Sequence, residues 1–406
     1  MPAINHLMRG SLTKVLLLSI LYVIEIYFLS ILAKFPLFND FIFRDIGQTV
    51  NILVLFIGFC LMILAFYSSV LMVFYLFSIF PCIVFSAFSD QWLFLSHLPI
   101  YFLFFIFIVG YISAGFIIPL KKIIATKIFY FTMLFLLFCF FVVLLTKVKF
   151  SFSIYDFYDQ RFLAREFSGI YQYSQAVVYS VVLPLVLVSK ISTGKKILFV
   201  VLINVVLFGS FGVRNGILIS VIALFIVNVT KNPSGKNIAL MFFYYLTAVT
   251  FIDLVITVEI FDLAVFGGIR RLIFAPGFWN EYALNNFMYL NVGPENPLSI
   301  EMGKKLFGKE TVVNANANVF VTGYAEFGLP LASVLFYSAG FFIGYLSKLC
   351  QRSGYPNLLV LQALIWSNLR VQSWILTGGL LLSSMLIVIF CLTNSSQKKF
   401  LKELIK

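Results

Sequence analysis

Residues 51–88 read NILVLFIGFCLMILAFYSSVLMVFYLFSIFPCIVFSAF, and this stretch contains no charged residue. A helix of about 20 apolar residues is long enough to cross a bilayer core of about 30 Å. The stretch is long enough for two such helices, and Ser68–Ser69 supplies a polar pair where a turn fits. The sequence therefore predicts two membrane-spanning helices, at 51–67 and 70–88, that meet at Ser68–Ser69.

The rest of the chain has the same character. Its 406 residues are 62% hydrophobic and 11% charged, with a mean hydropathy of +1.03. These values exclude a water-soluble globular protein and predict an all-α, polytopic membrane protein that forms a single integral domain over residues 1–406. About twelve apolar runs are long enough to cross the bilayer. They lie near residues 14–33, 51–67, 70–88, 98–119, 126–146, 173–189, 196–212, 216–230, 237–258, 327–347, 356–373 and 376–393.

Positive charge predicts the sides of the membrane on which the loops lie. With the amino terminus inside, sixteen of the 29 basic residues face the cytoplasm, accompanied there by one acid, Glu403. This asymmetry follows the positive-inside rule, so we expect both termini in the cytoplasm. The net charge of +13 therefore reflects membrane anchoring, and no nucleic-acid partner is predicted. One long span in place of the turn at Ser68–Ser69 would move every later loop to the opposite side.

Two predicted outer loops are too long to be simple connections. They cover residues 147–172 and 259–326. Long loops in compact proteins are usually functional or disordered. The second loop contains Trp279, Tyr282 and Phe287, which favour order, with short helices on the membrane surface as one arrangement.

Arginine and lysine are distributed in opposite ways. Most lysines fall on the predicted inner side, together with Arg9 and Arg352. A guanidinium group can bind a phosphate or carboxylate through two oxygens, which a lysine cannot do. The outer side is therefore predicted to bind a multiply charged anion. The arginines predicted there are Arg44, Arg161, Arg165, Arg214, Arg270, Arg271 and Arg370.

Three of these arginines are the strongest candidates. Arg214 lies in FGSFGVRNG, and Arg270 and Arg271 lie in FGGIRRLIFAPG. An arginine close to a membrane span normally has a partner or a function. Simpler interpretations stay open, because Arg214 can extend to the interface and the adjacent pair can contact lipid headgroups.

The remaining arginines are candidates for substrate binding. Arg161 and Arg165 are four residues apart and would share one face of a helix, with Asp156 shortly before them. A surface helix with internal ion pairs explains the same pattern. Arg370 lies near the outer end of the predicted span 356–373, where a plain apolar anchor does not explain it.

Glu326 is the first candidate for a general base. It lies in VVNANANVFVTGYAEFGLPLASVLF, which leads from the large outer loop into the predicted span 327–347, and nearby Tyr324 is a substrate-binding candidate. A carboxylate at this position can abstract a proton or serve as the counter-ion of an arginine, and both roles stay open. His97 is interpreted as interfacial packing. Other candidate bases are Asp156, Asp159, Asp253, Glu259 and Glu281.

The sequence lacks the motifs that bind ATP or a tightly held metal. It has no Walker loop, no HExxH and no cluster of histidine and cysteine. No cofactor and no metal are therefore predicted.

Together these features resemble the bacterial O-antigen polymerases, which join lipid-linked oligosaccharide repeat units. The similarity covers the whole architecture and rests on GVRNG at the start of a span, RR early in the large outer loop, and NAN followed by YAEFGLP before a late span. It implies a C-class glycosyltransferase fold in the bacterial inner membrane, with both long loops in the periplasm.

The resemblance also implies the reaction. A glycan carried on undecaprenyl diphosphate is transferred to a sugar hydroxyl of an incoming lipid-linked unit, and undecaprenyl diphosphate leaves. Arg214, Arg270 and Arg271 match the family's outer arginines and are expected to contact the diphosphates, while Glu326 stands in the late-span motif. Membrane lipid and a polysaccharide chain-length regulator are the expected partners.

Two related functions stay open. A flippase for the same lipid-linked oligosaccharides would have a similar number of spans, but it does not need a long outer loop with its own aromatic residues. An O-antigen ligase would share the arginines and the loop. A ligase would be expected to carry a histidine in residues 259–326, and that stretch has none.

Overall fold

The computed structural model contains helices and no strand among the residues that it describes. Three of the described helices are long and apolar enough to cross a membrane, at Ser69–Phe88, Leu95–Ser113 and Val319–Gln351. The chain is therefore an all-α membrane protein, as predicted. The structure describes residues 2–32, 51–88, 91–116, 177–183, 186, 192–211, 234–255, 273, 275–287, 298–307, 317–353, 359–367, 369, 373–374 and 379–387.

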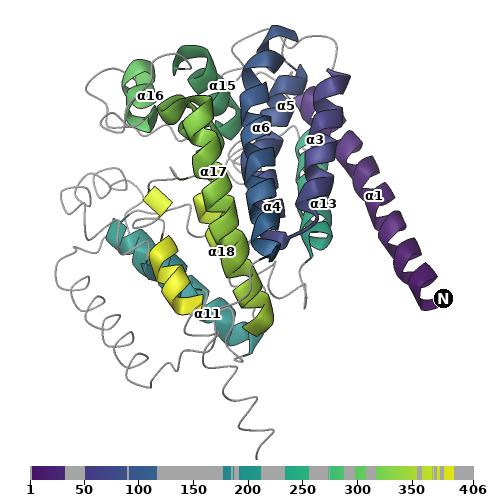
Figure 1. Ribbon diagram of the computed structural model, residues 1–406, viewed down its shortest axis with the longest axis vertical. Helices are drawn as coiled ribbons and strands as arrows, with labels where there is room; N and C mark the ends of the chain where they lie inside the picture. The colour runs from purple at the N-terminus through teal and green to yellow at the C-terminus, as the bar shows by residue number, and fades with distance from the viewer. Residues whose placement is uncertain are drawn as a thin grey trace, which may run out of the picture. The chain divides into compact units, whose positions relative to one another are not determined.

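The chain divides into two compact units. The first consists of Met1–Ser113, Ser234–Phe342 and Ser367–Arg370, and the second of Ala114–Pro233, Ile343–Trp366 and Val371–Lys406. The first unit holds most of the described helices (Figure 1). They are α1 (Pro2–Leu32), α3 (Ile52–Ala65), α4 (Ser69–Phe74), the π-helix η1 (Tyr75–Ile79), α5 (Phe80–Phe88), α6 (Gln91–Ser113), α13 (Gly235–Val255), α15 (Ala275–Phe287), α16 (Leu298–Phe307) and α17 (Val319–Ser353) up to Phe342.

The turn predicted at Ser68–Ser69 is present. Helix α3 ends at Ala65, and Ser68 adopts an extended backbone with φ −148° and ψ 144°. The Ser68 hydroxyl accepts a hydrogen bond of 3.2 Å from the Val70 amide and so caps the start of α4. Two helices are therefore present in place of one long helix, and the second, Ser69–Phe88, is long enough to cross a membrane. Helix α3 has only 14 residues, so its predicted crossing at 51–67 stays a prediction.

Helix α6 runs in the opposite direction to the helices α4, η1 and α5 that precede it. Helices α4, η1 and α5 form one continuous rod from Ser69 to Phe88. At one end of this rod Ser68 Oγ lies 2.6 Å from Tyr111 Oη, and near the other end the Tyr101 hydroxyl donates to Ser86 Oγ at 2.8 Å. Because residue numbers rise along one helix as they fall along the other, α6 runs antiparallel to the rod.

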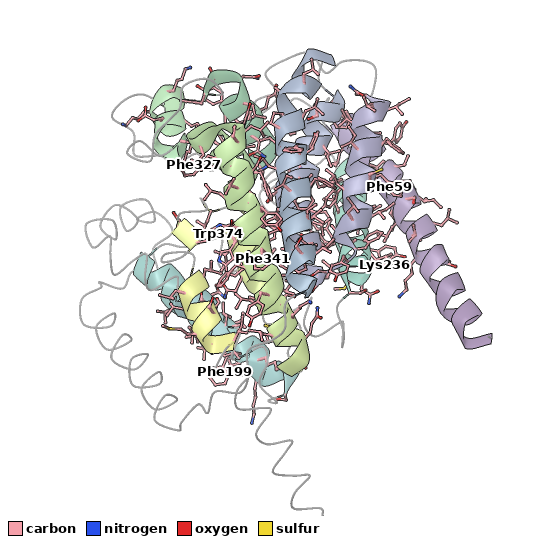
Figure 2. All side chains as sticks on the ribbon, viewed as in Figure 1. Phe59, Phe199, Lys236, Phe327, Phe341 and Trp374 are labelled. Carbon is pink, nitrogen blue, oxygen red and sulfur yellow. The ribbon has the colours of Figure 1, made fainter. Side chains whose placement is uncertain are left out.

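Helix α13 runs in the same direction as both α1 and the rod. Lys14 Nζ donates to Asn237 Oδ1 at 3.2 Å, and Thr247 Oγ1 donates to Glu25 Oε2 at 2.9 Å. From the first contact to the second, the residue number increases on both α1 and α13, so the two helices are parallel. Lys236 lies at the end of α13 next to the α3–α4 turn, with Nζ 6.0 Å from the centre of the Phe66 ring (Figure 2).

Helices α6 and α17 touch through their backbones. A Cβ atom added to Gly340 would lie 2.2 Å from the Phe107 carbonyl oxygen, and one added to Gly110 would lie 2.2 Å from the Tyr337 carbonyl oxygen. Further along, Lys348 Nζ donates to the Gly115 carbonyl oxygen. From the crossing at Gly110 and Gly340 to the Lys348–Gly115 hydrogen bond, residue numbers increase on both segments, so the long part of α17 runs parallel to α6. Glycine at both crossing positions permits this close approach.

Helix α17 reverses direction at Gly328. The ring centroids of Phe320 and Phe336 lie 4.6 Å apart, whereas sixteen residues of continuous helix would separate them by about 24 Å. Gly328 has φ 68° and ψ 168°, a backbone conformation that essentially only glycine adopts. Phe327 and Phe341 mark the two sides of the reversal in Figure 2. Residues 319–327, called the re-entrant helix below, therefore fold back against the long part of α17.

This reversal differs from the sequence expectation. Residues up to 326 were predicted as outer loop and 327 as the start of a span, whereas the helix begins at Val319. Gly323 makes room for the returning helix, because a Cβ atom there would lie 2.7 Å from the Phe336 ring. A single apolar run therefore contains two helical segments of opposite direction.

The second unit is described in fewer places. Within it, the Ser180 hydroxyl donates to Gln362 Oε1 at 3.3 Å, and Trp374 Nε1 donates to the Trp366 carbonyl oxygen at 3.0 Å. These bonds satisfy polar groups that are almost fully buried. Its elements include the π-helix η3 (Val178–Val182), α11 (Thr193–Phe211), α18 (Val360–Trp366) and the last part of α17.

Candidate functional site

The re-entrant helix begins halfway along the membrane-spanning rod. Asn318 Nδ2 donates a hydrogen bond of 2.8 Å to the carbonyl oxygen of Ser78. Ser78 is the tenth residue of the span Ser69–Phe88, about 15 Å from either end at 1.5 Å per residue. Irregular backbone at such depth is tolerated where it is buried in protein or lines a cavity. Asn318 is 1% exposed, so here the protein covers it.

Asn318 caps the re-entrant helix. Its Oδ1 accepts hydrogen bonds of 2.9 Å from the amides of Phe320 and Val321. The amide of Val319 donates to the carbonyl oxygen of Ser367 at 3.2 Å. These bonds satisfy amides that would otherwise be free at a helix start. This helix N-terminus is therefore occupied by the protein's own groups and does not present an anion site.

A second asparagine joins helix α15 to this helix start. The backbone amide of Asn318 donates to Asn280 Oδ1 at 2.7 Å, and Asn280 Nδ2 donates to Cys82 Sγ at 3.3 Å. Asn318 Nδ2 also lies 3.2 Å from the same sulfur. Helices α15, α17 and α5 therefore meet at one buried polar cluster. We call it the asparagine junction, formed by Ser78, Cys82, Asn280, Asn318 and Ser367.

The rod itself is modified where it meets the junction. Ser78 lies in the π-helix η1, a wider helical turn that is often found at functional sites. Its hydroxyl donates to the Ser367 carbonyl oxygen at 3.0 Å while its own carbonyl accepts from Asn318. This cluster was not predicted from the sequence. The available signals were Asn318 directly before an apolar helical run and Gly328 within it.

Glu326 lies at the other end of the re-entrant helix. Eight residues of helix carry it about 12 Å from Asn318, towards the end of the unit where α5 finishes. Glu326 is 5% exposed, and its Oε1 lies 3.5 Å from the amide of Leu298, the first residue of α16. A carboxylate is favourably placed at a helix N-terminus because the helix dipole is positive there. The structure thus holds Glu326 at a fixed position near the end of the bundle.

Helices α15 and α16 cover this end of the first unit. Both lie within the segment 259–326, where short helices were expected, and their place on the membrane surface stays a prediction. Gly277 allows α15 to approach α5, because a Cβ atom there would lie 2.1 Å from the Phe85 ring. Lys305 Nζ on α16 donates to Asn286 Oδ1 on α15 at 2.9 Å.

Helix α15 carries a set of aromatic rings. Tyr282 stacks on Phe278 with centroids 6.4 Å apart, and Trp279 meets Phe278 edge-on at 5.0 Å. Trp279 and Tyr282 are half-buried. Desolvation raises the pKa of Tyr282 above its usual value.

Three further candidates of the sequence analysis can be placed. Tyr324 is half-buried on the re-entrant helix, but it lies two residues before Glu326, and side chains two apart on a helix do not face each other. Glu281, on α15, is 8% exposed. His97 is fully buried and stacks on Tyr101 at 6.4 Å, in agreement with its interpretation as packing.

The candidate arginines lie outside the residues that the structure describes. Their contact with a diphosphate, or with Glu326 as counter-ion, stays a prediction. The candidates concerned are Arg161, Arg165, Arg214, Arg270, Arg271 and Arg370, together with Asp156.

Comparison with known proteins returned no significant match to a protein-family model, to a curated protein or to a solved structure.

Proposed function

We propose that the chain is a polymerase of undecaprenyl-diphosphate-linked oligosaccharide repeat units, acting at the periplasmic face of the bacterial inner membrane. The observation that carries the proposal is the placement of Glu326, a buried carboxylate at the end of a re-entrant helix beside two helices of the large predicted outer loop. The motifs around Arg214, Arg270 and Arg271 supply the predicted diphosphate ligands.

The helix directions support the proposed topology of about twelve spans. Helix α6 is antiparallel to the rod, and α13 is parallel to the rod, so α6 and α13 run in opposite directions. If both cross the membrane, an even number of crossings separates them. The sequence predicts an even set between them, at 126–146, 173–189, 196–212 and 216–230. With the amino terminus in the cytoplasm, as the positive-inside rule predicts, the proposed topology places both termini in the cytoplasm and α15 and α16 on the periplasmic side.

The proposed reaction is a glycosyl transfer. The acceptor hydroxyl oxygen forms a bond to the anomeric carbon of the donor glycan, and the bond from that carbon to the diphosphate oxygen breaks. The electron pair of the broken bond stays on undecaprenyl diphosphate, which leaves. Glu326 takes the proton of the acceptor hydroxyl as general base.

Arginine suits the leaving group in this reaction. Negative charge develops on the diphosphate as the bond breaks, and fixed donors stabilise charge that appears in the transition state. Each charge-assisted hydrogen bond contributes about 1.5–3 kcal/mol. Arg214, Arg270 and Arg271 are proposed for this role, with Arg161, Arg165 and Arg370 as supporting contacts.

The test is complementation of a strain that lacks its own repeat-unit polymerase, followed by gel analysis of the lipopolysaccharide ladder. A restored ladder supports the proposal. Without the protein, single repeat units should still reach the lipid A core. If cells without the protein accumulated unpolymerised units only on the cytoplasmic side, the protein would be a flippase. If they accumulated polymer still attached to undecaprenyl diphosphate, the protein would be a ligase.

A further inference from the structure

The re-entrant helix is held at two points that lie on different elements of the first unit. At its inner end Asn318 bonds to Ser78, Cys82 and Asn280. At its other end Glu326 accepts from the Leu298 amide. Gly328, directly after the helix, has the positive φ of a sharp turn. The helix can therefore change depth only if the junction at Asn318 opens.

Asn318 uses both ends of its side chain, each for a separate purpose. Oδ1 caps the helix through the amides of Phe320 and Val321, while Nδ2 reaches the Ser78 carbonyl oxygen and the Cys82 sulfur on the rod. Capping alone requires only an acceptor, which serine supplies as well as asparagine. The second pair of contacts requires a donor that extends further from the backbone, as the asparagine amide does.

We propose that Asn318 is a positioning residue that fixes the depth of the re-entrant helix, and through it the position of Glu326. Asn280 extends the same junction to α15, so α15 and the re-entrant helix are both bonded to the same part of the rod. The position of Glu326 rests on this anchoring, and the consequence for turnover rests on the proposed function.

The decisive variant is Asn318→Ser, which keeps an N-cap acceptor and removes the amide that reaches Ser78 and Cys82. Its matched control is Asn51→Ser. Asn51 caps α3 in the same way, with Oδ1 accepting from the amides of Leu53 and Val54 at 3.1 and 3.3 Å. Both changes retain capping, so only the first removes the anchor to the rod.

The first measurement is hydrogen–deuterium exchange of the full-length protein in detergent, followed on peptides that cover residues 319–327. We expect exchange there to become at least about tenfold faster in Asn318→Ser and to stay unchanged in Asn51→Ser. Peptides from α6 should be unchanged in both. Unchanged exchange of residues 319–327 in a folded Asn318→Ser protein would overturn the anchoring role.

A second variant, Cys82→Ala, tests the same anchor if Asn318→Ser fails to fold. Cys82→Ala removes the sulfur that both asparagine side chains contact and leaves the Ser78 carbonyl in place. It should give a smaller increase in exchange over residues 319–327. Failure of Cys82→Ala to change this exchange would also contradict the proposed junction.

The third measurement is steady-state polymerisation with purified lipid-linked repeat units. A displaced Glu326 should lower kcat by tenfold or more and change KM by less than about threefold, since the proposed diphosphate ligands Arg214, Arg270 and Arg271 do not belong to this helix. The positioning role would be overturned if Asn318→Ser exchanged faster over residues 319–327 but kept the wild-type kcat, while Glu326→Gln was inactive. An inactive wild-type protein would contradict the proposed function alone, because the exchange result does not depend on it.

Discussion

Thr247 Oγ1 donates a hydrogen bond of 2.9 Å to Glu25 Oε2, across helices α13 and α1 of the first unit. Glu25 is fully buried, and it lies in a helix where the sequence predicts a membrane span. Ionisable groups inside a membrane are costly and usually face a polar partner. This bond therefore contributes to the pairing of two helices that are distant in sequence.

Removal of the Thr247 hydroxyl should weaken that pairing. Thr247→Val keeps the shape of the side chain and loses the donor, and interhelical hydrogen bonds in membrane proteins contribute about 0.6 kcal/mol on average and up to about 1.7 kcal/mol. We expect a loss of stability in this range, measured by unfolding in mixed detergent micelles. Glu25→Gln retains an acceptor for Thr247 and should lose less. Equal stability of Thr247→Val and the wild type would show that the bond contributes nothing.

Gly340 should not tolerate a side chain. A Cβ atom at this position would lie 2.2 Å from the Phe107 carbonyl oxygen, so α6 and α17 would have to separate. Gly340→Ala should destabilise the protein by about 1–3 kcal/mol, as overpacking does elsewhere. The control is Gly194→Ala on α11, where a Cβ atom would meet nothing within 4 Å. Thermal denaturation in detergent compares the two, and similar melting temperatures would contradict the close helix crossing.

Gly328 is required for its backbone and not for its small size. A Cβ atom there would meet nothing within 4 Å, but φ 68° with ψ 168° is strained for any other residue. Gly328→Ala should cost about 1–3 kcal/mol. Exchange of residues 319–327 should increase while the α3 peptides stay protected. A fully stable Gly328→Ala protein with unchanged exchange would argue against a reversal at this residue.

Neutralisation of Glu326 should abolish turnover with little change in structure. Glu326→Gln keeps an oxygen that can accept from the Leu298 amide, but it cannot take the acceptor proton. General base catalysis contributes about 10²–10⁴-fold, and kcat should fall by that factor. The control is Glu301→Gln, which removes the charge that pairs with Lys304 at 3.0 Å on α16. Normal ladders from Glu326→Gln cells at wild-type abundance would exclude the general-base role.

The predicted diphosphate ligands should require arginine and not only positive charge. In Arg214→Lys, Arg270→Lys and Arg271→Lys the two-oxygen contact is lost. A lost charge-assisted hydrogen bond of about 1.5–3 kcal/mol corresponds to a decrease in rate of roughly 10–150-fold. Shortened or absent ladders at normal protein abundance are expected. Arg44→Lys serves as the control, since no role is assigned to Arg44, and normal ladders from the first three variants would reject the bidentate contact.

Much of the fold could be predicted from local composition. The polar pair at Ser68–Ser69 interrupts a charge-free run, and serine there caps a helix, so the turn was evident without tertiary information. The reversal at Gly328 was missed because the residues on both of its sides are apolar and helical. Hydropathy measures the length of such a run and not its direction.

The junction could not be predicted for a different reason. Asn280 and Asn318 are 38 residues apart, and neither forms a catalytic motif with its neighbours. Their meeting point is created by the third partner, Cys82, which lies 198 residues before Asn280 and 236 before Asn318. Glu326 was proposed from the sequence because a carboxylate near a predicted membrane surface suggests chemistry, and its catalytic role stays a prediction. The arginines stay predictions, since they fall outside the described residues.

The parallel pairing of α1 with α13 has a consequence for biosynthesis. Glu25 and Thr247 are separated by 222 residues, which a ribosome takes about 11–44 s to add at 5–20 residues per second. During that interval the first helix has been made while its partner does not yet exist. The hydrogen bond between Glu25 and Thr247 can therefore form only after synthesis has passed the middle of α13, so this pairing of α1 with α13 is a late step in the assembly of the first unit.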